Sequence, residues 1–145
     1  MTSEQHALVR KTFARVLPFT AEAARHFYQS LFELDPSLRA LFPGDTEVQG
    51  RKLIQTLAVI VKSVDRLDAI YPELEQLALR HKSYGVSAEN FETVQEALLM
   101  TLRHFAGDQF SAEAEAAWRA MYQTVADVML TKICDRHGET GARSA

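Results

Sequence analysis

The sequence predicts an all-α fold. Apolar residues recur at helical spacing along most of the chain, and no segment shows the two-residue alternation of a half-buried strand. Six Gly and four Pro are too few to divide 145 residues into the many short strands of an all-β protein. With 47% hydrophobic residues, a chain of this length can form the core of one soluble globular domain without disulfides or structural metals.

The first two helices are expected on either side of residue 18. Residues 4–17 carry apolar side chains three to five positions apart, and Pro18 interrupts this pattern. Thr20 is the expected N-cap of the next helix, over 21–34, because a threonine hydroxyl can accept a hydrogen bond from a free backbone N–H. The apolar stripe of this second helix consists of Ala24, Phe27, Tyr28, Leu31 and Phe32.

A short helix and a long helix follow. Asp35 and Pro36 are typical of a helix start, with the carboxylate as cap and the proline in the first turn. The short helix is expected to end near Phe42, because residues 43–44 are Pro-Gly, a loop signal. The long helix is expected over 46–64. Its apolar stripe consists of Leu53, Leu57, Ile60, Val61 and Val64.

Two further helices follow a polar connection over 65–70. Tyr71 and a proline after it open the first of them, which is expected to end at residues 84–85. Ser87 begins the second, which is expected to end at Gly107, a residue that commonly follows a helix. These helices differ in length from the ones before them, which argues against a symmetric four-helix bundle.

The last helix is expected from Ser111, its cap, to about Ile133. Residues 135–145 contain Arg, Gly, Glu, Thr and Ser without periodicity, so we expect a disordered tail there and a single domain over 1–134. In total, six or seven helices and no internal repeat are expected.

Composition excludes several classes of function. A formal net charge of −3 leaves no basic surface for nucleic acid. The single cysteine, Cys134, excludes a disulfide framework and a multi-cysteine metal site. The longest apolar run, 57–61, is far shorter than the roughly 18 residues of a membrane span, and the polar residues 1–6 resemble no signal peptide. We therefore expect a cytoplasmic protein that acts on a small molecule, a cofactor or a partner.

His81 is the first candidate for a functional residue. It follows Leu77 by four positions and Leu74 by seven, so it prolongs an apolar stripe and should point inward. An inward histidine is often a core residue whose hydrogen bonds are satisfied, and at this point that interpretation stays open. No second histidine or glutamate lies at metal-ligand spacing, so a metal bound here must bring its other ligands, as haem does.

Tyr28 and Gln49 also lie on inward stripes. Tyr28 can be a core aromatic residue, and Gln49, four residues before Leu53, can be the exposed edge of an amphipathic helix. Neither interpretation explains why a Tyr, a Gln and a His occur together on the inward stripes of three helices. The remaining histidines are expected at the surface or near chain and helix ends: His6, His26, His104 and His137.

Taken together, these segments resemble the globins. The resemblance extends over residues 4–133 and is closest to bacterial single-domain haemoglobins and to the haem domain of flavohaemoglobins, with neuroglobin more distant. It implies the globin fold, with six to eight helices arranged three over three around a haem. The motifs that carry it are Phe27-Tyr28 with Leu31-Phe32, Asp35-Pro36, Leu41-Phe42, Gln49 with Lys52-Leu53, Arg80-His81-Lys82, Tyr84-Gly85-Val86, and Ala117-Trp118 with Tyr122.

The resemblance also implies roles for single residues. His81 matches the proximal ligand of the haem iron, and its second ring nitrogen can donate to the carbonyl of Leu77. Phe42 matches the aromatic residue that packs against the haem plane, and Lys52 either pairs with a haem propionate or is simply solvated. The residues that match the distal ligand-binding side are Tyr28, Gln49 and Leu53. Those that match the proximal side of the cofactor are Leu77, Val86 and Phe91.

The implied function is reversible binding of dioxygen, nitric oxide or carbon monoxide at five-coordinate haem b (iron protoporphyrin IX), as in oxygen transport. Donors at Tyr28 and Gln49 imply high dioxygen affinity, and Gln49 in the distal position argues against bis-histidyl ligation. The alternative is nitric-oxide dioxygenase or nitrite reductase activity with a separate reductase, since 145 residues leave no room for a flavin-binding unit. Flavohaemoglobins support the proximal histidine with a Tyr and a Glu, and Phe91 and Ile133 match these positions, so the imidazole is expected to be less basic.

Overall fold

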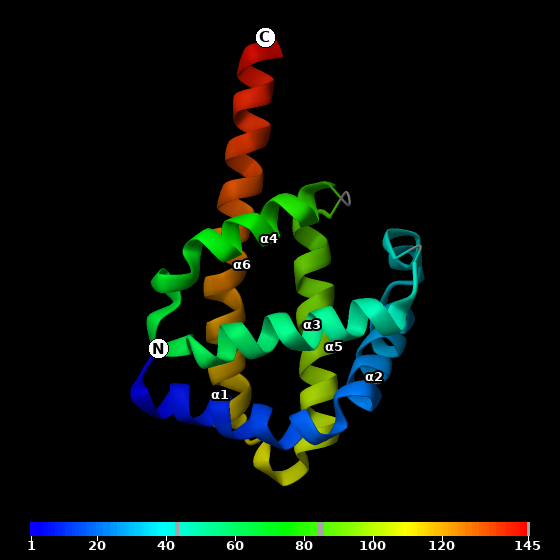
Figure 1. Cartoon of the computed structure of the whole chain (residues 1–145), viewed down its shortest axis with the longest axis vertical. Helices are drawn as coiled ribbons and strands as arrows, with labels where there is room; N and C mark the ends of the chain where they lie inside the picture. The colour runs from blue at the N-terminus through cyan, green and yellow to red at the C-terminus, as the bar shows by residue number, and fades with distance from the viewer. Residues whose placement is uncertain (43, 84–85, 145) are drawn as a thin grey trace.

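All described elements of the structure are helices (Figure 1). It is a computed structural model that describes residues 1–42, 44–83 and 86–144, although the side chains of 82–83 and 133–144 lie outside the description. No strand occurs in this part of the chain. The elements in order are α1 (Ser3–Val16), η1 (Leu17–Phe19), α2 (Thr20–Leu34), η2 (Pro36–Leu41), α3 (Thr46–Lys62), η3 (Val64–Ile70), α4 (Tyr71–Ser83), α5 (Ala88–Ala106), η4 (Gly107–Gln109) and α6 (Ala112–Ser144), where η denotes a 3-10 helix.

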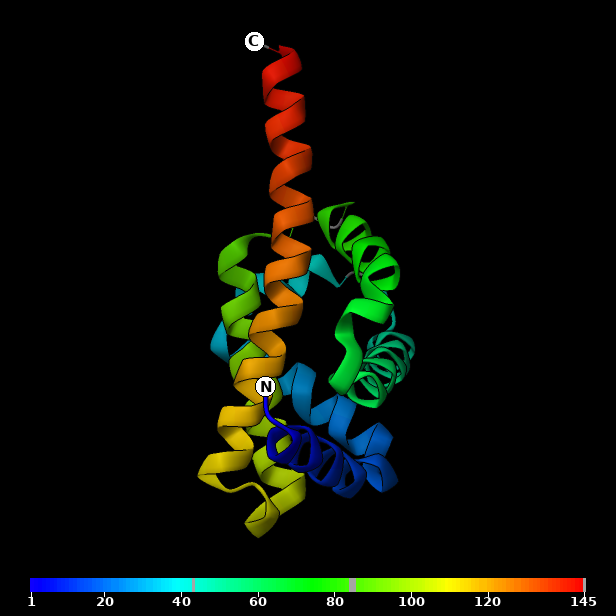
Figure 2. The same cartoon turned by 90° about the vertical axis from the view of Figure 1, so that its left-hand side faces the viewer.

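The α-helices form two crossing layers. Figure 1 shows α1, α3 and α4 crossing in front of α5 and α6, and Figure 2 shows the same two groups from the side. α2 packs against α3 of the first layer and against α5 of the second, while α1 and α4 both pack against α6. This arrangement of crossing helical layers confirms the predicted all-α fold.

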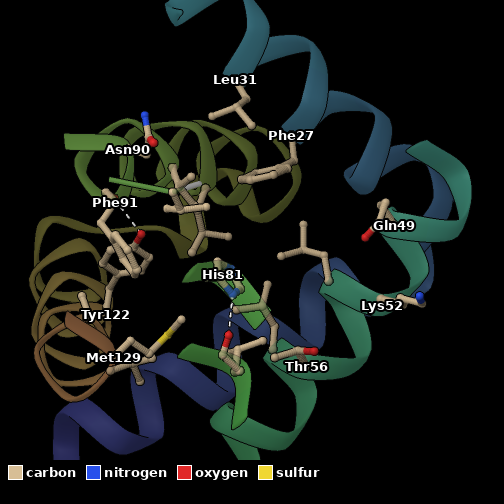
Figure 3. Close-up of a pocket in the computed structure, with 18 of the residues that line it drawn as sticks. Phe27, Leu31, Gln49, Lys52, Thr56, His81, Asn90, Phe91, Tyr122 and Met129 are labelled. Atoms are coloured by element: carbon tan, nitrogen blue, oxygen red, sulfur yellow. Dashed lines mark hydrogen bonds between the residues drawn. The ribbon is translucent and has the colours of Figure 1, made fainter. Parts of the chain in front are cut away.

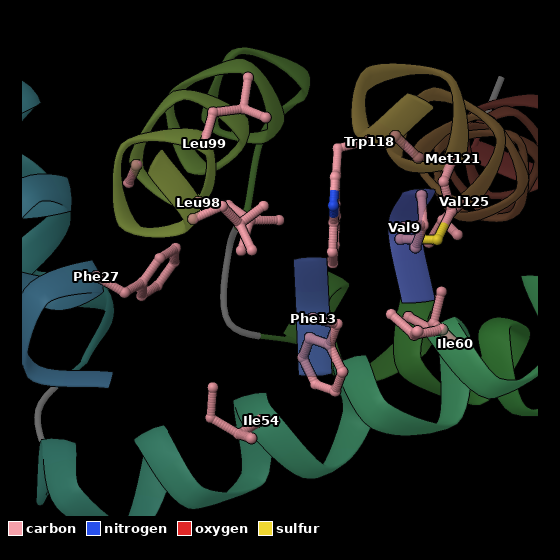
Figure 4. Packing of buried hydrophobic residues seen from close by; sticks show 14 of the residues in the cluster. Val9, Phe13, Phe27, Ile54, Ile60, Leu98, Leu99, Trp118, Met121 and Val125 are labelled. Carbon is pink, nitrogen blue, oxygen red and sulfur yellow. The ribbon is translucent and has the colours of Figure 1, made fainter. Parts of the chain in front are cut away.

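Fully buried side chains of α1 and α6 meet where these two helices cross. Trp118 is 1% exposed, and its indole N–H donates a 2.6 Å hydrogen bond to the hydroxyl of Thr12, which is fully buried. The ring of Phe13 lies beside this indole, with centroids 6.2 Å apart (Figure 4). A buried N–H needs such a partner, so this bond fixes the two helices to each other.

Several predicted helix ends are confirmed. The carboxylate of Asp35 accepts a hydrogen bond from the backbone N–H of Ser37 at 3.1 Å, and the hydroxyl of Ser111 accepts one from the N–H of Ala114 at 3.1 Å. Gly107 ends α5 with a φ of 56°, a conformation that costs glycine little because it lacks a Cβ.

Two predictions for the first half of the chain are wrong. Thr20 is not an N-cap, because α2 begins at Thr20 itself and the hydroxyl donates to the carbonyl of Leu17 at 2.7 Å. This bond to a nearby carbonyl competes with capping. The long helix ends at Lys62, and the segment expected to be a polar connection forms the 3-10 helix η3, over 64–70. Val64 and Leu67 are buried there, so packing on the core favours the helical turns.

The last helix does not end near Ile133, because α6 continues to Ser144. The division into a domain over 1–134 and a tail over 135–145 stays a prediction, and the side chain of Cys134 lies outside the described residues, as does the expected helix end at 84–85. Within the described part of the chain, no helix, α6 included, has an apolar stretch long enough to cross a lipid bilayer.

The crossing of α2 and α3 depends on Gly50. A Cβ added to Gly50 would lie 2.6 Å from the Cβ of Ala24 and 3.7 Å from Cε2 of Tyr28. The first distance is shorter than real Cβ atoms show, so the helices can approach this closely only without a side chain at residue 50. The crossing brings Tyr28 of α2 and Gln49 of α3 to the same cavity.

Candidate functional site

A cavity of about 430 Å³ lies between the two layers, a volume typical of ligand and cofactor sites. Side chains from α2, η2, α3, α4, α5 and α6 line it, and most of them are apolar or aromatic (Figure 3). Every site residue predicted from the sequence lines this cavity: Tyr28, Phe42, Gln49, Lys52, Leu53, Leu77, His81, Val86 and Phe91. The fold therefore brings together residues that are spread over more than sixty positions of the chain.

His81 enters the cavity from α4 with one ring nitrogen engaged. Its Nδ1–H donates to the backbone carbonyl of Leu77 at 2.8 Å, the dashed line at its ring in Figure 3. This is the bond that the sequence predicts, and it favours the tautomer in which Nε2 carries the lone pair. Burial lowers the pKa of the imidazole. The charge of Arg80 lowers this pKa as well, while the hydrogen bond to Leu77 raises it. The imidazole is therefore neutral at pH 7, the form that binds a metal.

Tyr28 faces the cavity from α2 as a neutral phenol. It is 7% exposed, and burial raises the pKa of its hydroxyl to about 12. The ring is held edge-on against Phe27 and Phe42, with centroids 5.1 and 5.3 Å away. Among the described residues the hydroxyl has no hydrogen-bond partner, so its proton is available to a ligand in the cavity.

α3 places an amide, an ammonium group and an apolar side chain along one side of the cavity. Gln49 and Leu53 are half-buried, whereas Lys52 is exposed. Figure 3 shows the amide of Gln49 turned toward the cavity and the ammonium group of Lys52 turned outward at its edge. In this orientation the amide oxygen faces the cavity, so a half-turn of the amide group would present its N–H donors to a ligand there, while Lys52 can reach only a charged group at the mouth of the cavity.

The other end of the cavity is largely apolar around His81. The ring of Phe91 lies 6.3 Å from the imidazole, centroid to centroid. Tyr122 of α6 also lines the cavity, but its hydroxyl donates to the backbone carbonyl of Phe91 at 2.6 Å. Burial raises the pKa of Tyr122, so this donor stays protonated. No side-chain donor or acceptor at residue 91 supports the imidazole, as the sequence predicts; the side chain of Ile133 lies outside the described residues.

Sequence reasoning missed part of the lining. Thr56 follows Leu53, a predicted inward residue, by three positions, and Tyr122 follows Trp118 by four, so helical spacing puts each on the same face as its partner. This spacing was the available signal for both. The remaining polar side chains that line the cavity without having been predicted are Gln55, Arg80 and Asn90.

The donor set of the cavity fits a cofactor that brings most of its own ligands. Among the described residues there is no group of three or more His, Cys, Asp or Glu side chains that could hold a metal ion. One neutral imidazole in a mostly apolar cavity is what haem requires of a protein. Lys52 and Arg80, both exposed residues on the lining, are suited to the propionates of such a cofactor.

Comparison with known proteins decides the family. The family model for globins matches residues 25–129, from α2 to α6. The chain belongs to the globin family. The matched stretch of this globin contains every predicted site residue, and the family is a haem-binding one whose members take small gas ligands at the haem.

Flavohemoproteins are similar to this globin along most of its length. The Vibrio cholerae flavohemoprotein is 32% identical over 142 residues, 95% of this chain and 35% of the relative. The Bordetella parapertussis flavohemoprotein is 33% identical over 134 residues, 90% of this chain and 33% of the relative. The Halalkalibacterium halodurans flavohemoprotein is 29% identical over 133 residues, 90% of this chain and 32% of the relative. This globin thus spans about a third of the length of these relatives.

A solved structure has the same fold. The engineered carbene transferase RmaNOD, described as a candidate nitric oxide dioxygenase from Rhodothermus marinus, superposes on this globin with a TM-score of 0.87. The alignment covers 97% of this chain and 99% of the other, at 23% identity. At this identity the similarity establishes the fold alone.

Proposed function

We propose that this globin binds dioxygen reversibly at haem b and releases it slowly, with nitric oxide and carbon monoxide as further ligands. The observation that carries the proposal is a single cavity lined by one oriented imidazole, His81, and by two hydrogen-bond donors on other helices, Tyr28 and Gln49. His81 would hold iron protoporphyrin IX in this cavity, and the bound cofactor would supply an iron to which a diatomic gas can bind.

His81 is the proposed protein ligand of the iron. The bond from its Nδ1–H to Leu77 orients the ring and directs the Nε2 lone pair to the metal. A backbone carbonyl is a weaker acceptor than a carboxylate, so the imidazole gains only modest basicity from this bond. Such a ligand suits gas binding better than the cleavage of an O–O bond.

Tyr28 and Gln49 are the proposed distal donors. A dioxygen ligand carries partial negative charge, and a hydrogen bond to a charged group contributes about 1.5–3 kcal/mol. Tyr28 has a pKa of about 12 and therefore keeps its proton at neutral pH. Its hydroxyl has no competing hydrogen-bond partner among the described residues. Both donors therefore slow the release of dioxygen, because the hydrogen bonds must break before the ligand leaves.

Lys52 is proposed to pair with a haem propionate at the mouth of the cavity. Its side chain is exposed, and exposed ion pairs contribute about 0–1 kcal/mol. Replacing it with alanine is therefore expected to speed haem loss less than about fivefold. Solvation of Lys52 without a partner would leave the rate of haem loss unchanged.

A second candidate function is nitric-oxide dioxygenation or nitrite reduction. It is favoured by the similarity to flavohemoproteins, whose other two thirds this chain does not span. The electrons would then come from a separate reductase. Reversible gas binding requires no such partner. Sustained consumption of nitric oxide with added reductant would support the enzyme, whereas one stoichiometric burst would support the gas-binding protein.

Absorption spectra of the ferric, ferrous and dioxygen-treated protein test the main proposal. We expect one haem per chain and a five-coordinate ferrous spectrum that changes with dioxygen. His81→Gly should lose haem affinity and recover it with added imidazole, while the control His104→Ala, on the exposed side of α5, should behave as the wild type. A protein without a Soret band that takes up no hemin would overturn the proposal. A low-spin bis-imidazole ferric spectrum would contradict the distal assignment.

A further inference from the structure

Phe32 lies next to the proposed distal donor but outside the cavity. It follows Tyr28 by four residues on α2, and the two rings stack with centroids 6.0 Å apart and planes at 27°. Its ring also meets Phe42 edge-on, with centroids 5.7 Å apart. Phe32 is half-buried and does not line the cavity. It therefore touches two site residues without being able to touch a ligand.

A cation from the exposed residue Arg39 lies over the ring of Phe32. The guanidinium carbon of Arg39, from η2, lies 5.1 Å from the centroid of the Phe32 ring. A guanidinium in this position is attracted by the π-electrons of the ring. Tyr28, Phe32, Phe42 and Arg39 thus form a continuous group, which we call the distal stack, from the cavity wall to the surface.

Packing alone fixes the direction of the Tyr28 hydroxyl. Among the described residues this hydroxyl has no hydrogen-bond partner, so no polar contact holds it in place. Phe27 and Phe42 meet the ring edge-on, while Phe32 is the residue that stacks on its face. Removing the stacked ring opens space on the face that it covers, and the tyrosine can then turn toward that space.

We propose that Phe32 is a positioning residue that holds the Tyr28 hydroxyl in its donor orientation, with Arg39 as its outer support. The inference rests on the proposed function, since it concerns the hydrogen bond to a bound gas. It predicts that a residue without contact to the ligand controls the rate at which dioxygen leaves. If the role of Phe32 were purely structural, replacing it would change stability but not the ratio of the dioxygen and carbon monoxide dissociation rates.

The test compares Phe32→Leu with a matched control, Phe110→Leu. Phe110 is also half-buried and also lies under a guanidinium, that of Arg103 at 5.7 Å, but it does not line the cavity or touch the distal stack. Dissociation rates of dioxygen and of carbon monoxide are measured for both variants. Dioxygen responds strongly to a hydrogen-bond donor, while carbon monoxide, which carries little charge, responds weakly.

Phe32→Leu is expected to raise the dioxygen dissociation rate about two- to twelvefold, the range that corresponds to an aromatic pair worth about 0.5–1.5 kcal/mol. The carbon monoxide rate should change less than about twofold. Phe110→Leu should change neither rate, and Phe32→Tyr, which keeps the ring, should restore the wild-type value. In the Tyr28→Phe background, Phe32→Leu should have no further effect on dioxygen, because the donor is already absent.

A second readout does not depend on gas release. In the carbonmonoxy form, NMR of labelled tyrosine reports the ring-flip rate of Tyr28, which should rise in Phe32→Leu and stay unchanged in Phe110→Leu. Should Phe32→Leu fail to fold, Arg39→Met replaces an exposed side chain and is expected to raise the dioxygen rate about twofold.

The outcomes separate this inference from the proposed function. If the wild type takes up haem and dioxygen, and Tyr28→Phe speeds dioxygen release, but Phe32→Leu or its substitute Arg39→Met does not, the positioning role is wrong and the function stands. Equal acceleration of dioxygen and carbon monoxide would also overturn it. A wild type that binds neither haem nor gas overturns the function first.

Discussion

Replacing Gly50 by alanine tests whether the close contact between α2 and α3 builds the distal side of the cavity. The new Cβ would lie 2.6 Å from the Cβ of Ala24, whereas ordinary contact begins at 3.4 Å, so the helices must separate by about 0.8 Å. Overpacking of this kind costs about 1–3 kcal/mol, and replacing a helical glycine by alanine returns about 1 kcal/mol. We expect Gly50→Ala to lower the free energy of unfolding by about 0–2 kcal/mol, which is the cost of overpacking less the gain in helix propensity.

The assay is urea unfolding followed by circular dichroism, with two controls. Gly44→Ala introduces a Cβ that meets nothing within 4 Å and should change stability by less than about 0.5 kcal/mol. In an Ala24→Gly background the opposing methyl group is gone, so Gly50→Ala should there be stabilising, by about 1 kcal/mol, through helix propensity alone. The reasoning is refuted if Gly50→Ala has the same effect in both backgrounds.

Three further predictions concern a donor, a buried hydrogen bond and a titrating side chain. Tyr28→Phe should raise the dioxygen dissociation rate at least about tenfold, measured by stopped-flow displacement with carbon monoxide, while Tyr122→Phe, whose hydroxyl is bonded elsewhere, should not; an unchanged rate for Tyr28→Phe would sink its assignment as donor. Thr12→Val leaves the indole N–H of Trp118 buried without a partner and should cost about 1–3 kcal/mol in urea unfolding, so a neutral result would contradict the importance of that bond. Burial, together with the facing imidazole of His104 on α5, lowers the pKa of His26 below its ordinary 6.5. The contribution of His26 to stability is therefore complete above pH 6.5 and is lost as the pH falls below that value. Stability measured between pH 7.5 and 5 should therefore decline less steeply in His26→Gln than in the wild type, and equal slopes would exclude the effect.

The helices of this protein could be predicted well where local chemistry decides them. Asp35 caps the turn that follows it, Ser111 caps α6, and Gly107 ends α5, each through bonds or conformations within a few residues. Local chemistry also explains a failure. The hydroxyl of Thr20 bonds to a carbonyl three residues earlier instead of capping a helix, and both options are equally local in the sequence.

The candidate site also combines features that the sequence predicts with features that depend on packing between helices. Spacing of four and seven residues placed His81 on an inward stripe, and its bond to Leu77 lies within one helix. The spacing of Tyr122 after Trp118 was a signal of the same kind, whereas no spacing in the sequence indicated a role at the site for Gly50 or Phe32. Contacts between elements determine the surroundings of all three: Gly50 faces Ala24 of α2, Phe32 packs on Phe42 as well as on Tyr28 of its own helix, and Tyr122 donates to the carbonyl of Phe91 on α5.

Amino-acid order alone was enough for the class of fold, most helix boundaries, the inward direction of His81 and a resemblance to globins, because helical periodicity and caps depend on neighbours in the chain. The distance at which α2 can approach α3, the stacking of Phe32 on the proposed donor and the shape of the cavity depend on how separate helices pack. Packing is set by contacts between side chains far apart in sequence, each sensitive to a single methyl group. A glycine at residue 50 therefore looks like an ordinary weak helix former until the facing Ala24 is in place.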